Sequence, residues 1–320
     1  MNKLWKQVDW RRVLALVLAL AAIIALLVTS LQADPLDSGL ATKTIFTNEG
    51  HNHYEDLRLE GNSIIVIDLV SDEVLFDRLP DAQLPIASIT KLMTALAASD
   101  LLPAEAKIDI TQEALATEGS SGLSLGERWN LDALIDHMLV GSSNDGAAAI
   151  ALATNAPDLS LVDRMNRYAE ELGMHQTYFL NETGLDTGKS MAGAYASARD
   201  VATLLDTTLK TKPNILMATV AGSITRSAVN SHSLSVNNTN ESAGRMVGLL
   251  GSKTGYTDLA GGNLAVVFDV GINHPVAVVV LGATVAGRER DVEQLIVATQ
   301  RRYELLSPAF DVGSLQEQSF

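Results

Sequence analysis

Two side chains that could form a nucleophilic pair stand three residues apart, at Ser88 and Lys91. The stretch 88–98 has apolar residues at helical spacing and contains neither glycine nor proline, which predicts a buried helix. Residues three apart share one face of a helix, so the hydroxyl of Ser88 can meet the amine of Lys91. A serine becomes nucleophilic when a neighbouring base takes its proton, and lysine can be that base only when its amine is neutral. The ordinary lysine pKa of about 10.4 must therefore be lowered, as apolar surroundings or a second cation would do.

A Ser-x-x-Lys motif is weak evidence alone, because the same residues could be a helix cap followed by an exposed lysine. Two further motifs follow it along the chain. The segment Ser142–Asn144 is a Ser-x-Asn on a turn predicted between two helices, although Ser235–Asn237 fits the same pattern and a polar turn is the alternative. The segment Lys253–Gly255 ends a β-rich stretch, where an exposed strand edge is the alternative. The order and spacing of the three motifs, rather than any one of them, point to a catalytic site.

The elements that must position these motifs are predicted from hydrophobic periodicity. Within residues 57–308, strands are predicted near both ends, helices are predicted between them, and one more helix is predicted after the last strand. The predicted strands are 63–68, 74–76, 246–250, 262–269 and 276–281, and the predicted helices are 88–98, 131–139, 145–154, 161–172 and 291–306. Strands that enclose a helical middle predict an α+β fold, with one antiparallel sheet flanked by helices and an adjoining all-helical subdomain.

The N-terminus has the features of a membrane anchor. Basic residues between Lys3 and Arg12 precede an uncharged apolar run from Val13 to Ala33, and about 20 such residues can cross a bilayer as a helix. A cleaved signal peptide usually has a shorter apolar core and an A-x-A-like site, so we favour an uncleaved transmembrane helix with a cytoplasmic basic end. The chain is accordingly divided into 1–33 (basic flank and anchor, or signal peptide), 34–56 (linker), 57–308 (catalytic domain) and 309–320 (acidic tail).

Composition excludes several functions. A formal net charge of -15 argues against nucleic-acid binding, which needs clustered lysine and arginine. The chain has no cysteine, so disulfides and thiolate metal sites are excluded. Its six histidines form no H-E-x-x-H zinc motif, and Ser88 is not in a G-x-S-x-G turn. We therefore expect neither a metal nor another cofactor.

Taken in order, the three motifs resemble the recurring trio of the penicillin-recognising serine enzymes. The surrounding residues are similar to the low-molecular-mass D-alanyl-D-alanine carboxypeptidases, which are penicillin-binding proteins, from about Leu57 to about Leu306. The segments that carry this resemblance are Leu84–Ala95, Asn144–Ala147, Leu172–Met174, Thr183–Leu185 and Ser252–Thr257. The resemblance implies a DD-peptidase/β-lactamase-like fold and removal of the terminal D-alanine from peptidoglycan stem peptides outside the cytoplasmic membrane. It also implies covalent inhibition by β-lactam antibiotics.

The resemblance also assigns catalytic roles. Ser88 is implied to be the nucleophile that becomes acylated, and Lys91 its general base. Ser142 is implied to relay a proton to the leaving D-alanine. Asn144 is implied to hold the substrate amide and help orient Lys91, while Lys253 keeps the site electropositive and lowers the pKa of Lys91.

The remaining implied residues bind the substrate. Thr254 is implied to bind its terminal carboxylate, with Gly255 in the same segment, and the backbone N–H groups of Ser88 and Tyr256 are implied to form the oxyanion hole. Arg288 is implied to bind the same carboxylate, for which its planar guanidinium is suited; a surface ion pair is the alternative.

Two departures from the family pattern stand out. Glu182 occupies a position where relatives generally carry proline, which bears on a loop beside the site. Most relatives add a C-terminal β-domain and an amphipathic anchor, whereas the acidic segment 311–320 is not expected to bind an anionic membrane, so the N-terminal helix is expected to anchor the chain.

Three other functions remain open. A peptidoglycan DD-endopeptidase would share all three motifs. A class A-like β-lactamase would need a glutamate that activates water, and Glu170, Glu171 and Glu182 do not match that loop. A non-catalytic peptidoglycan-binding module would not need all three motifs intact.

Overall fold

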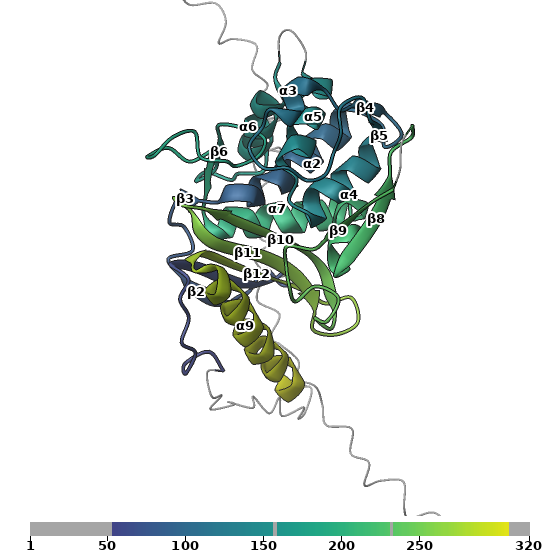
Figure 1. The fold of residues 1–320 in the computed structure, drawn as a ribbon. Helices are drawn as coiled ribbons and strands as arrows, with labels where there is room; N and C mark the ends of the chain where they lie inside the picture. The colour runs from purple at the N-terminus through teal and green to yellow at the C-terminus, as the bar shows by residue number, and fades with distance from the viewer. Residues whose placement is uncertain (1–52, 156–158, 231–232, 307–320) are drawn as a thin grey trace, which may run out of the picture. The chain divides into compact units, whose positions relative to one another are not determined.

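A five-stranded antiparallel sheet forms the centre of the computed structural model, which describes residues 53–155, 159–230 and 233–306 (Figure 1). The strand order is β10-β11-β12-β1-β2. The bounds are Ser63–Asp68 for β1, Val74–Arg78 for β2, Leu249–Thr257 for β10, Gly261–Asp269 for β11 and Pro275–Ala283 for β12. Strand β1 pairs with β12 so that Ile64 lies opposite Val280. Segments distant in sequence therefore build one sheet.

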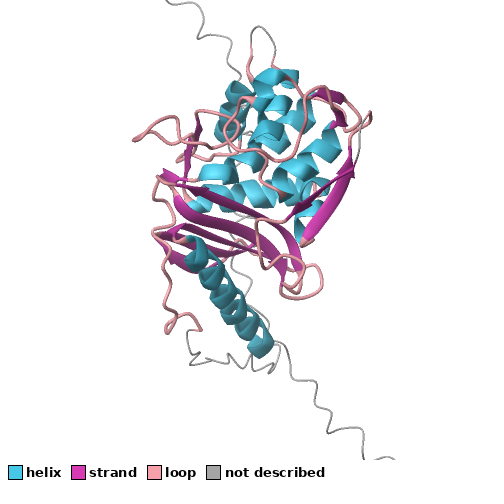
Figure 2. Ribbon diagram, in the orientation of Figure 1, coloured by secondary structure: helices cyan, strands magenta, loops and turns pink. Residues whose placement is uncertain are grey.

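Both faces of the sheet are covered, which explains why its strands read as continuous apolar runs. Consecutive residues Ile64, Ile65 and Val66 are all fully buried, although their side chains alternate between faces. One face packs against helix α9 (Val285–Leu306), and the other faces helix α7 (Ala198–Thr211) (Figures 1 and 2). Two separate apolar clusters result, one on each side of the sheet.

Helix α2 (Thr90–Leu101) runs through the helical part, and all of its residues from Thr90 to Ala98 are buried. It packs against α4 (Leu131–Val140), α5 (Asn144–Thr154), α6 (Leu161–Glu171) and α7. A 3-10 helix, η1 (Ala87–Ile89), leads into α2. The other elements are β3 (Leu84–Pro85), β4 (Lys107–Asp109), α3 (Gln112–Leu115), β5 (Arg128–Asn130), β6 (Tyr178–Phe179), β7 (Ala194–Ala196), α8 (Asn214–Met217), η2 (Ala218–Val220), β8 (Ser223–Ser227) and β9 (Ser233–Asn237).

The predicted α+β class, the initial hairpin and the three middle helices are confirmed. The strand predicted at 246–250 is wrong in its bounds, because β10 extends to Thr257 and contains the Lys253–Gly255 motif. The closing helix begins at Val285 rather than Asp291. Helix α7 and the β8–β9 hairpin were not predicted.

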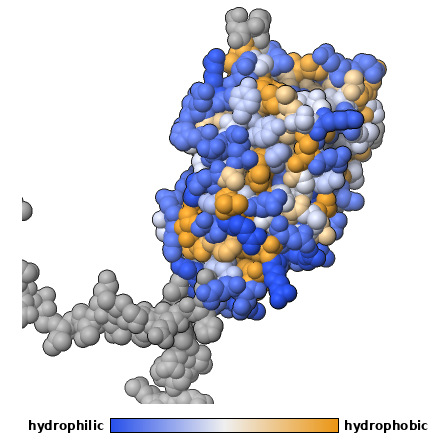
Figure 3. All heavy atoms as spheres, turned by 90° about the vertical axis from the view of Figure 1, so that its left-hand side faces the viewer, coloured by the Kyte–Doolittle hydropathy of each residue, from blue (hydrophilic) through white to orange (hydrophobic). Residues whose placement is uncertain are grey.

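The predicted anchor at 1–33 and the tail at 309–320 lie outside the described residues. Within the part of the chain that is described, no helix combines the length and apolar character needed to cross a bilayer. On the face seen in Figure 3, apolar side chains form small patches among hydrophilic ones.

Candidate active site

Ser88 lies in η1, directly before the central helix α2, and follows a residue with a strained backbone. Ala87 has a φ of 48°, in the left-handed region that residues other than glycine rarely adopt. The Thr90 hydroxyl donates to the Ala87 carbonyl at 2.7 Å. Gly184 packs against that carbonyl so closely that a Cβ at this position would lie 2.0 Å from the oxygen. The turn before Ser88 is therefore fixed from both sides.

The amine of Lys91 contacts Ser88 directly. Lys91 is fully buried, and its Nζ lies 2.7 Å from Ser88 Oγ. It also lies 2.7 Å from Asn144 Oδ1 and 2.8 Å from the carbonyl oxygen of Thr183. These three contacts hold the amine in one place beside the hydroxyl.

Burial lowers the pKa of Lys91 to about 7, because the ammonium form loses its hydration. The carboxylates of Glu182 and Asp145 oppose this shift. Of the two causes expected from the sequence, apolar surroundings and a second cation, desolvation is the largest in the structure. A substantial fraction of Lys91 is then neutral near pH 7.

Ser142 lies on the turn between α4 and α5, and Asn144 is the first residue of α5. Ser142 has a φ of 58°, and the Ser143 hydroxyl caps α5 by accepting from the backbone N–H of Gly146 at 2.8 Å. The side-chain amide of Asn144 donates to the carbonyl of Glu118 at 2.9 Å while its oxygen accepts from Lys91. The amide orientation is thereby fixed.

A polar network behind this turn was not predicted from sequence. Ser121 Oγ donates to Asp145 Oδ1 at 2.6 Å and lies 2.8 Å from Ser143 Oγ. His137 Nε2 lies 3.1 Å from Ser121 Oγ. The network joins the loop containing Ser121 to the turn containing Ser142. Its members are isolated polar residues in the sequence, and no motif connects them.

Strand β10 forms the opposite wall. Lys253 is almost fully buried, and its Nζ donates to Ser142 Oγ at 3.0 Å and to the Thr254 carbonyl at 2.9 Å. Burial holds the pKa of Lys253 well below its ordinary value, and the charges of Lys91 and Arg288 lower it further. Thr254 Oγ1 lies 2.5 Å from Thr239 Oγ1.

Gly255 lets this strand approach the nucleophile. A Cβ here would lie 2.6 Å from the Ile86 carbonyl oxygen and 3.2 Å from the backbone nitrogen of Ser88. The next residue, Tyr256, is 55% exposed. Arg288 is buried on α9, and its Nη1 donates to the Gly255 carbonyl at 2.9 Å. The structure thus brings together all three motifs, and it buries Arg288 instead of leaving it on the surface, which was the alternative to carboxylate binding.

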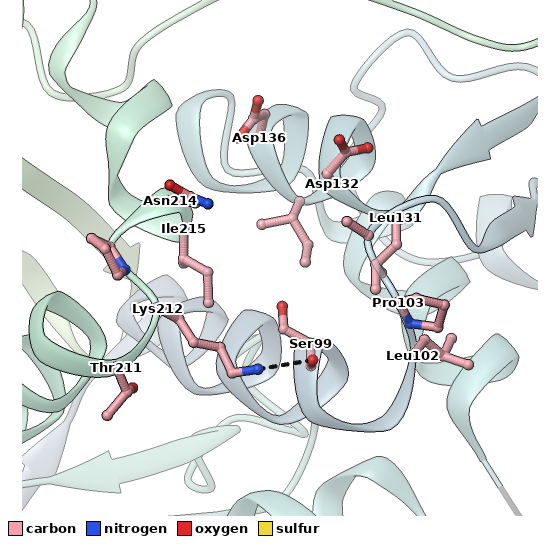
Figure 4. Close-up of a pocket in the computed structure, with 13 residues that line it drawn as sticks. Ser99, Leu102, Pro103, Leu131, Asp132, Asp136, Thr211, Lys212, Asn214 and Ile215 are labelled. Atoms are coloured by element: carbon pink, nitrogen blue, oxygen red, sulfur yellow. Dashed lines mark hydrogen bonds between the residues drawn. The ribbon is translucent and has the colours of Figure 1, made fainter.

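A separate pocket lies at the ends of α2 and α4 away from these motifs (Figure 4). Leu102, Leu131 and Ile215 provide apolar walls. Lys212 Nζ donates to the Ser99 carbonyl at 3.0 Å and pairs with Asp100. None of the sequence-predicted site residues lines this pocket.

A family model described as D-alanyl-D-alanine carboxypeptidase, peptidase S11, matches residues 50–285. The chain belongs to this family. As a peptidase S11 member it carries Ser88, Lys91, Ser142 and Lys253 within the matched region. The DD-peptidase fold implied by the motifs is therefore shown.

Curated relatives include both carboxypeptidases and an endopeptidase. The chain is 28% identical to the carboxypeptidase DacF of Bacillus subtilis over 81% of this chain and 67% of that protein, and 29% identical to DacA of Escherichia coli over 78% and 63%. It is 30% identical to the D-alanyl-D-alanine endopeptidase of Escherichia coli over 70% of this chain and 72% of that protein. The matches thus span about two thirds of the length of these relatives.

Solved structures agree with the family. Penicillin-binding protein D2 of Listeria monocytogenes, in its ampicillin-bound form, is 29% identical with a TM-score of 0.66, over 76% of this chain and 98% of that one. A D-alanyl-D-alanine carboxypeptidase of Mycobacterium tuberculosis has a TM-score of 0.68 at 23% identity, over 76% and 92%. The latter likeness concerns the fold.

Proposed function

We propose that this chain is a serine D-alanyl-D-alanine carboxypeptidase that works through an acyl-enzyme on Ser88. The observation that carries the proposal is the 2.7 Å contact between the buried amine of Lys91 and the Ser88 hydroxyl. An amine with a pKa of about 7 can take the serine proton at neutral pH.

In the first step, Ser88 Oγ attacks the carbonyl carbon of the penultimate D-alanine while Lys91 accepts the hydroxyl proton. The tetrahedral intermediate then loses the terminal D-alanine as the proton held by Lys91 passes through Ser142 to the leaving amine, so that Lys91 is neutral again. Lys253 Nζ donates to Ser142 Oγ and so keeps that hydroxyl aligned. In the second step, water attacks the ester, Lys91 takes a proton from the water, and Ser88 regains its hydroxyl proton as the shortened peptide leaves.

The remaining site residues bind substrate in this proposal. Asn144 holds the substrate amide, and Thr254, in the segment with Gly255, binds the terminal carboxylate. The N–H groups of Ser88 and Tyr256 stabilise the oxyanion. Arg288 lies behind β10, so its contribution to carboxylate binding is long-range attraction. The same site is expected to react covalently with β-lactams.

A DD-endopeptidase is the second candidate, favoured by the match to 72% of the length of the Escherichia coli endopeptidase. Both reactions use the same acylation step. They differ in the leaving group, which is free D-alanine in one case and a cross-linked peptide in the other.

The deciding experiment uses the detergent-solubilised full chain. It is incubated with a fluorescent penicillin, a diacyl-Lys-D-Ala-D-Ala peptide and a purified cross-linked muropeptide. We expect labelling and D-alanine release, both lost in Ser88→Ala and Lys91→Ala and kept in the control Ser223→Ala, which lies on exposed β8. Cleavage of the cross-linked muropeptide alone would establish the endopeptidase instead. Rapid penicillin turnover without D-alanine release would indicate a β-lactamase, and no labelling would indicate a binding module.

We also propose that residues 1–33 anchor the chain in the cytoplasmic membrane, with the 57–308 domain outside. The basic flank followed by the apolar run supports this orientation. Membrane fractionation of cells that express the full chain tests it. Release of a shortened chain into the soluble fraction would show a cleaved signal peptide instead.

A further inference from the structure

The pocket at the ends of α2 and α4 has a volume of about 340 Å³ and lies apart from the motif residues (Figure 4). Pockets of this size hold small molecules, which usually contact apolar walls and a few polar groups. The walls come from three segments: the end of α2 with the loop after it, the first turns of α4, and the turn that joins α7 to α8. Leu131 and Ile215 are almost fully buried among these walls, and Leu102 is partly buried. The proposed peptidase mechanism uses none of these residues.

Two carboxylates lie along the α4 edge of this pocket, at Asp132 and Asp136 (Figure 4). They are four residues apart on one helix, so they share a face, and like charges in this arrangement repel each other. Arg226 pairs with Asp136, whose Oδ2 lies 2.7 Å from the guanidinium Nε. Asp132 is exposed, and among the described residues it has no ion-pair partner. The edge therefore keeps one negative charge without a counter-charge.

The remaining charges at the pocket also favour a cation. Lys212 lines the pocket, but its Nζ is already engaged, 2.7 Å from the carboxylate of Asp100 and 3.0 Å from the carbonyl oxygen of Ser99. Of the three longer helices at the pocket, α2 and α7 end there and α4 begins there. The C-terminal carbonyls of a helix carry a partial negative charge, so two helix ends add to the charge of Asp132 and one opposes it. A ligand with an ammonium group therefore fits the pocket better than a carboxylate of the same shape.

The elements that form the pocket also position the three motifs. Helix α2 lines the pocket at its last turn and has Lys91 in its first turn. Helix α4 lines the pocket at its first turns and ends two residues before Ser142. Helix α8 packs against β10, where a Cβ at Gly251 would lie 2.8 Å from the Cβ of Leu216, and Lys253 follows on the same strand. Because rigid elements transmit a displacement from one end to the other, a ligand in this pocket acts on all three motifs.

We propose that this pocket binds a small organic cation with an apolar body, and that the bound cation slows the acylation of Ser88. The apolar body packs against Leu131 and Ile215, and the ammonium pairs with Asp132. The amine of Lys91 is already within hydrogen-bond distance of Ser88 Oγ, at 2.7 Å, so a shift of α2 lengthens this contact and lowers the rate. The inference goes beyond the proposed function, because binding at this pocket requires neither the nucleophile nor a peptide substrate.

The binding test uses three probes of similar shape: 2-phenylethylamine, the neutral 2-phenylethanol and the anionic phenylacetate. Saturation-transfer NMR titrations on the detergent-solubilised full chain give their dissociation constants. We expect the amine to bind about three- to fivefold more tightly than the alcohol, as for exposed ion pairs, and the anion to bind most weakly. Asp132→Asn should remove the preference for the amine, whereas Asp163→Asn, also exposed in the first turn of a helix but outside the pocket, should keep it. Equal binding of the amine and the alcohol to wild type overturns the inference.

A second variant controls for binding elsewhere, including partition into the detergent. Ser99 lies in the middle of the pocket, so Ser99→Leu should fill the pocket and abolish binding of all three probes (Figure 4). Binding to Ser99→Leu that equals binding to wild type places the probes elsewhere and overturns the inference.

The effect on Ser88 is measured as the rate of acylation by a saturating fluorescent penicillin, at which simple competition for the active site disappears. We expect saturating 2-phenylethylamine to slow wild type at least about fivefold and to leave Ser99→Leu unchanged. If Ser99→Leu does not fold, Asp132→Asn serves instead and should need about three- to fivefold more amine for the same slowing. An unchanged wild-type rate overturns the effect on Ser88. A chain that binds the amine but is never labelled by penicillin contradicts the proposed function and leaves the binding site standing.

Discussion

The lysine beside Ser88 balances two opposing environments. Burial favours its neutral form, whereas the carboxylates of Glu182 and Asp145 favour the ammonium. With a pKa of about 7, we expect the rate of penicillin acylation to rise through pH 7 and to fall about tenfold per pH unit below pH 6. Stopped-flow measurement of acylation between pH 5 and 9 checks this.

Glu182→Gln provides a sharper version of that measurement. The carboxylate of Glu182 raises the pKa of Lys91, so removing it should shift the rise of the acylation rate to lower pH. The variant should therefore react faster than wild type at pH 5.5. Glu170→Gln, at an exposed position of α6, is the control and should leave the pH dependence of the acylation rate unchanged. An unchanged pH dependence in Glu182→Gln would show that this carboxylate does not affect the pKa of Lys91.

A single methyl group at Gly255 should disturb the approach of β10 to the nucleophile. An added Cβ would lie 2.6 Å from the Ile86 carbonyl oxygen, so β10 or the turn before Ser88 must move. We expect Gly255→Ala to lower the acylation rate about a hundredfold, as small misplacements of reacting groups do. Gly188→Ala, where a Cβ meets open space, should keep near-normal acylation. Equal rates in both variants would show that the close approach of β10 is not needed.

At the residue scale, the sequence predicted those groups whose side chains form motifs. The order of the three motifs predicted that four side chains share one site, and the structure places these together: Ser88, Lys91, Ser142 and Lys253. The Thr183 carbonyl that accepts from Lys91 could not be found this way, because every residue has a backbone carbonyl. The contact of Arg288 with the Gly255 carbonyl could not be found either, for the same reason.

The helices and strands were predicted well where the local hydrophobic pattern determines their conformation, and poorly where pairing with a distant strand determines it. Helices α4, α5 and α6 have clear periodicity and were predicted nearly to their ends. Strand β10 contains Gly251, Ser252 and Gly255, which have low β propensity, so its second half was not recognised. Pairing with β11 along its length imposes the extended conformation. Helix α7 was not predicted, although Ser197 caps it and apolar residues recur along it.

Two helix caps allow the effect of a residue on the geometry of the site to be separated from its effect on the stability of the fold. Ser143 caps α5 beside the site, and Ser160 caps α6 away from the motif residues. Replacing either by alanine should lower the free energy of unfolding by about 1 kcal/mol. Only Ser143→Ala should also slow acylation, because Ser143 joins the network that fixes the Ser142 turn. Urea unfolding and penicillin acylation measured on both variants check this, and equal acylation rates would contradict it.

At the scale of the whole molecule, the ends of the catalytic domain are joined by a few buried groups. Strand β1 pairs with β12, and Asp291 on α9 accepts from the backbone N–H groups of Glu60 and Gly61 at 2.8 and 2.7 Å. These contacts close the sheet and bring α9 across it. Since Arg288 is on the first turn of α9 and holds Gly255, the stability of this closure and the geometry of the site are linked.

Asp68 accepts several hydrogen bonds that connect β1 to other parts of the domain. It accepts from the N–H of Val70 at 2.8 Å, from His274 at 2.7 Å and from the hydroxyl of Tyr303 on α9. Burial raises the pKa of Asp68, but these hydrogen bonds outweigh it and hold the pKa below its ordinary value. A carboxylate with a lowered pKa stabilises the fold above its unfolded-state pKa of about 3.9, and this contribution is lost as the pH falls. Asp68→Asn should therefore cost about 2 kcal/mol at pH 7 and about 1 kcal/mol less at pH 3, in urea unfolding. Asp72→Asn, exposed in the same turn, is the control with little effect at either pH, and an Asp68→Asn cost independent of pH would show that the charge of Asp68 does not hold the joint.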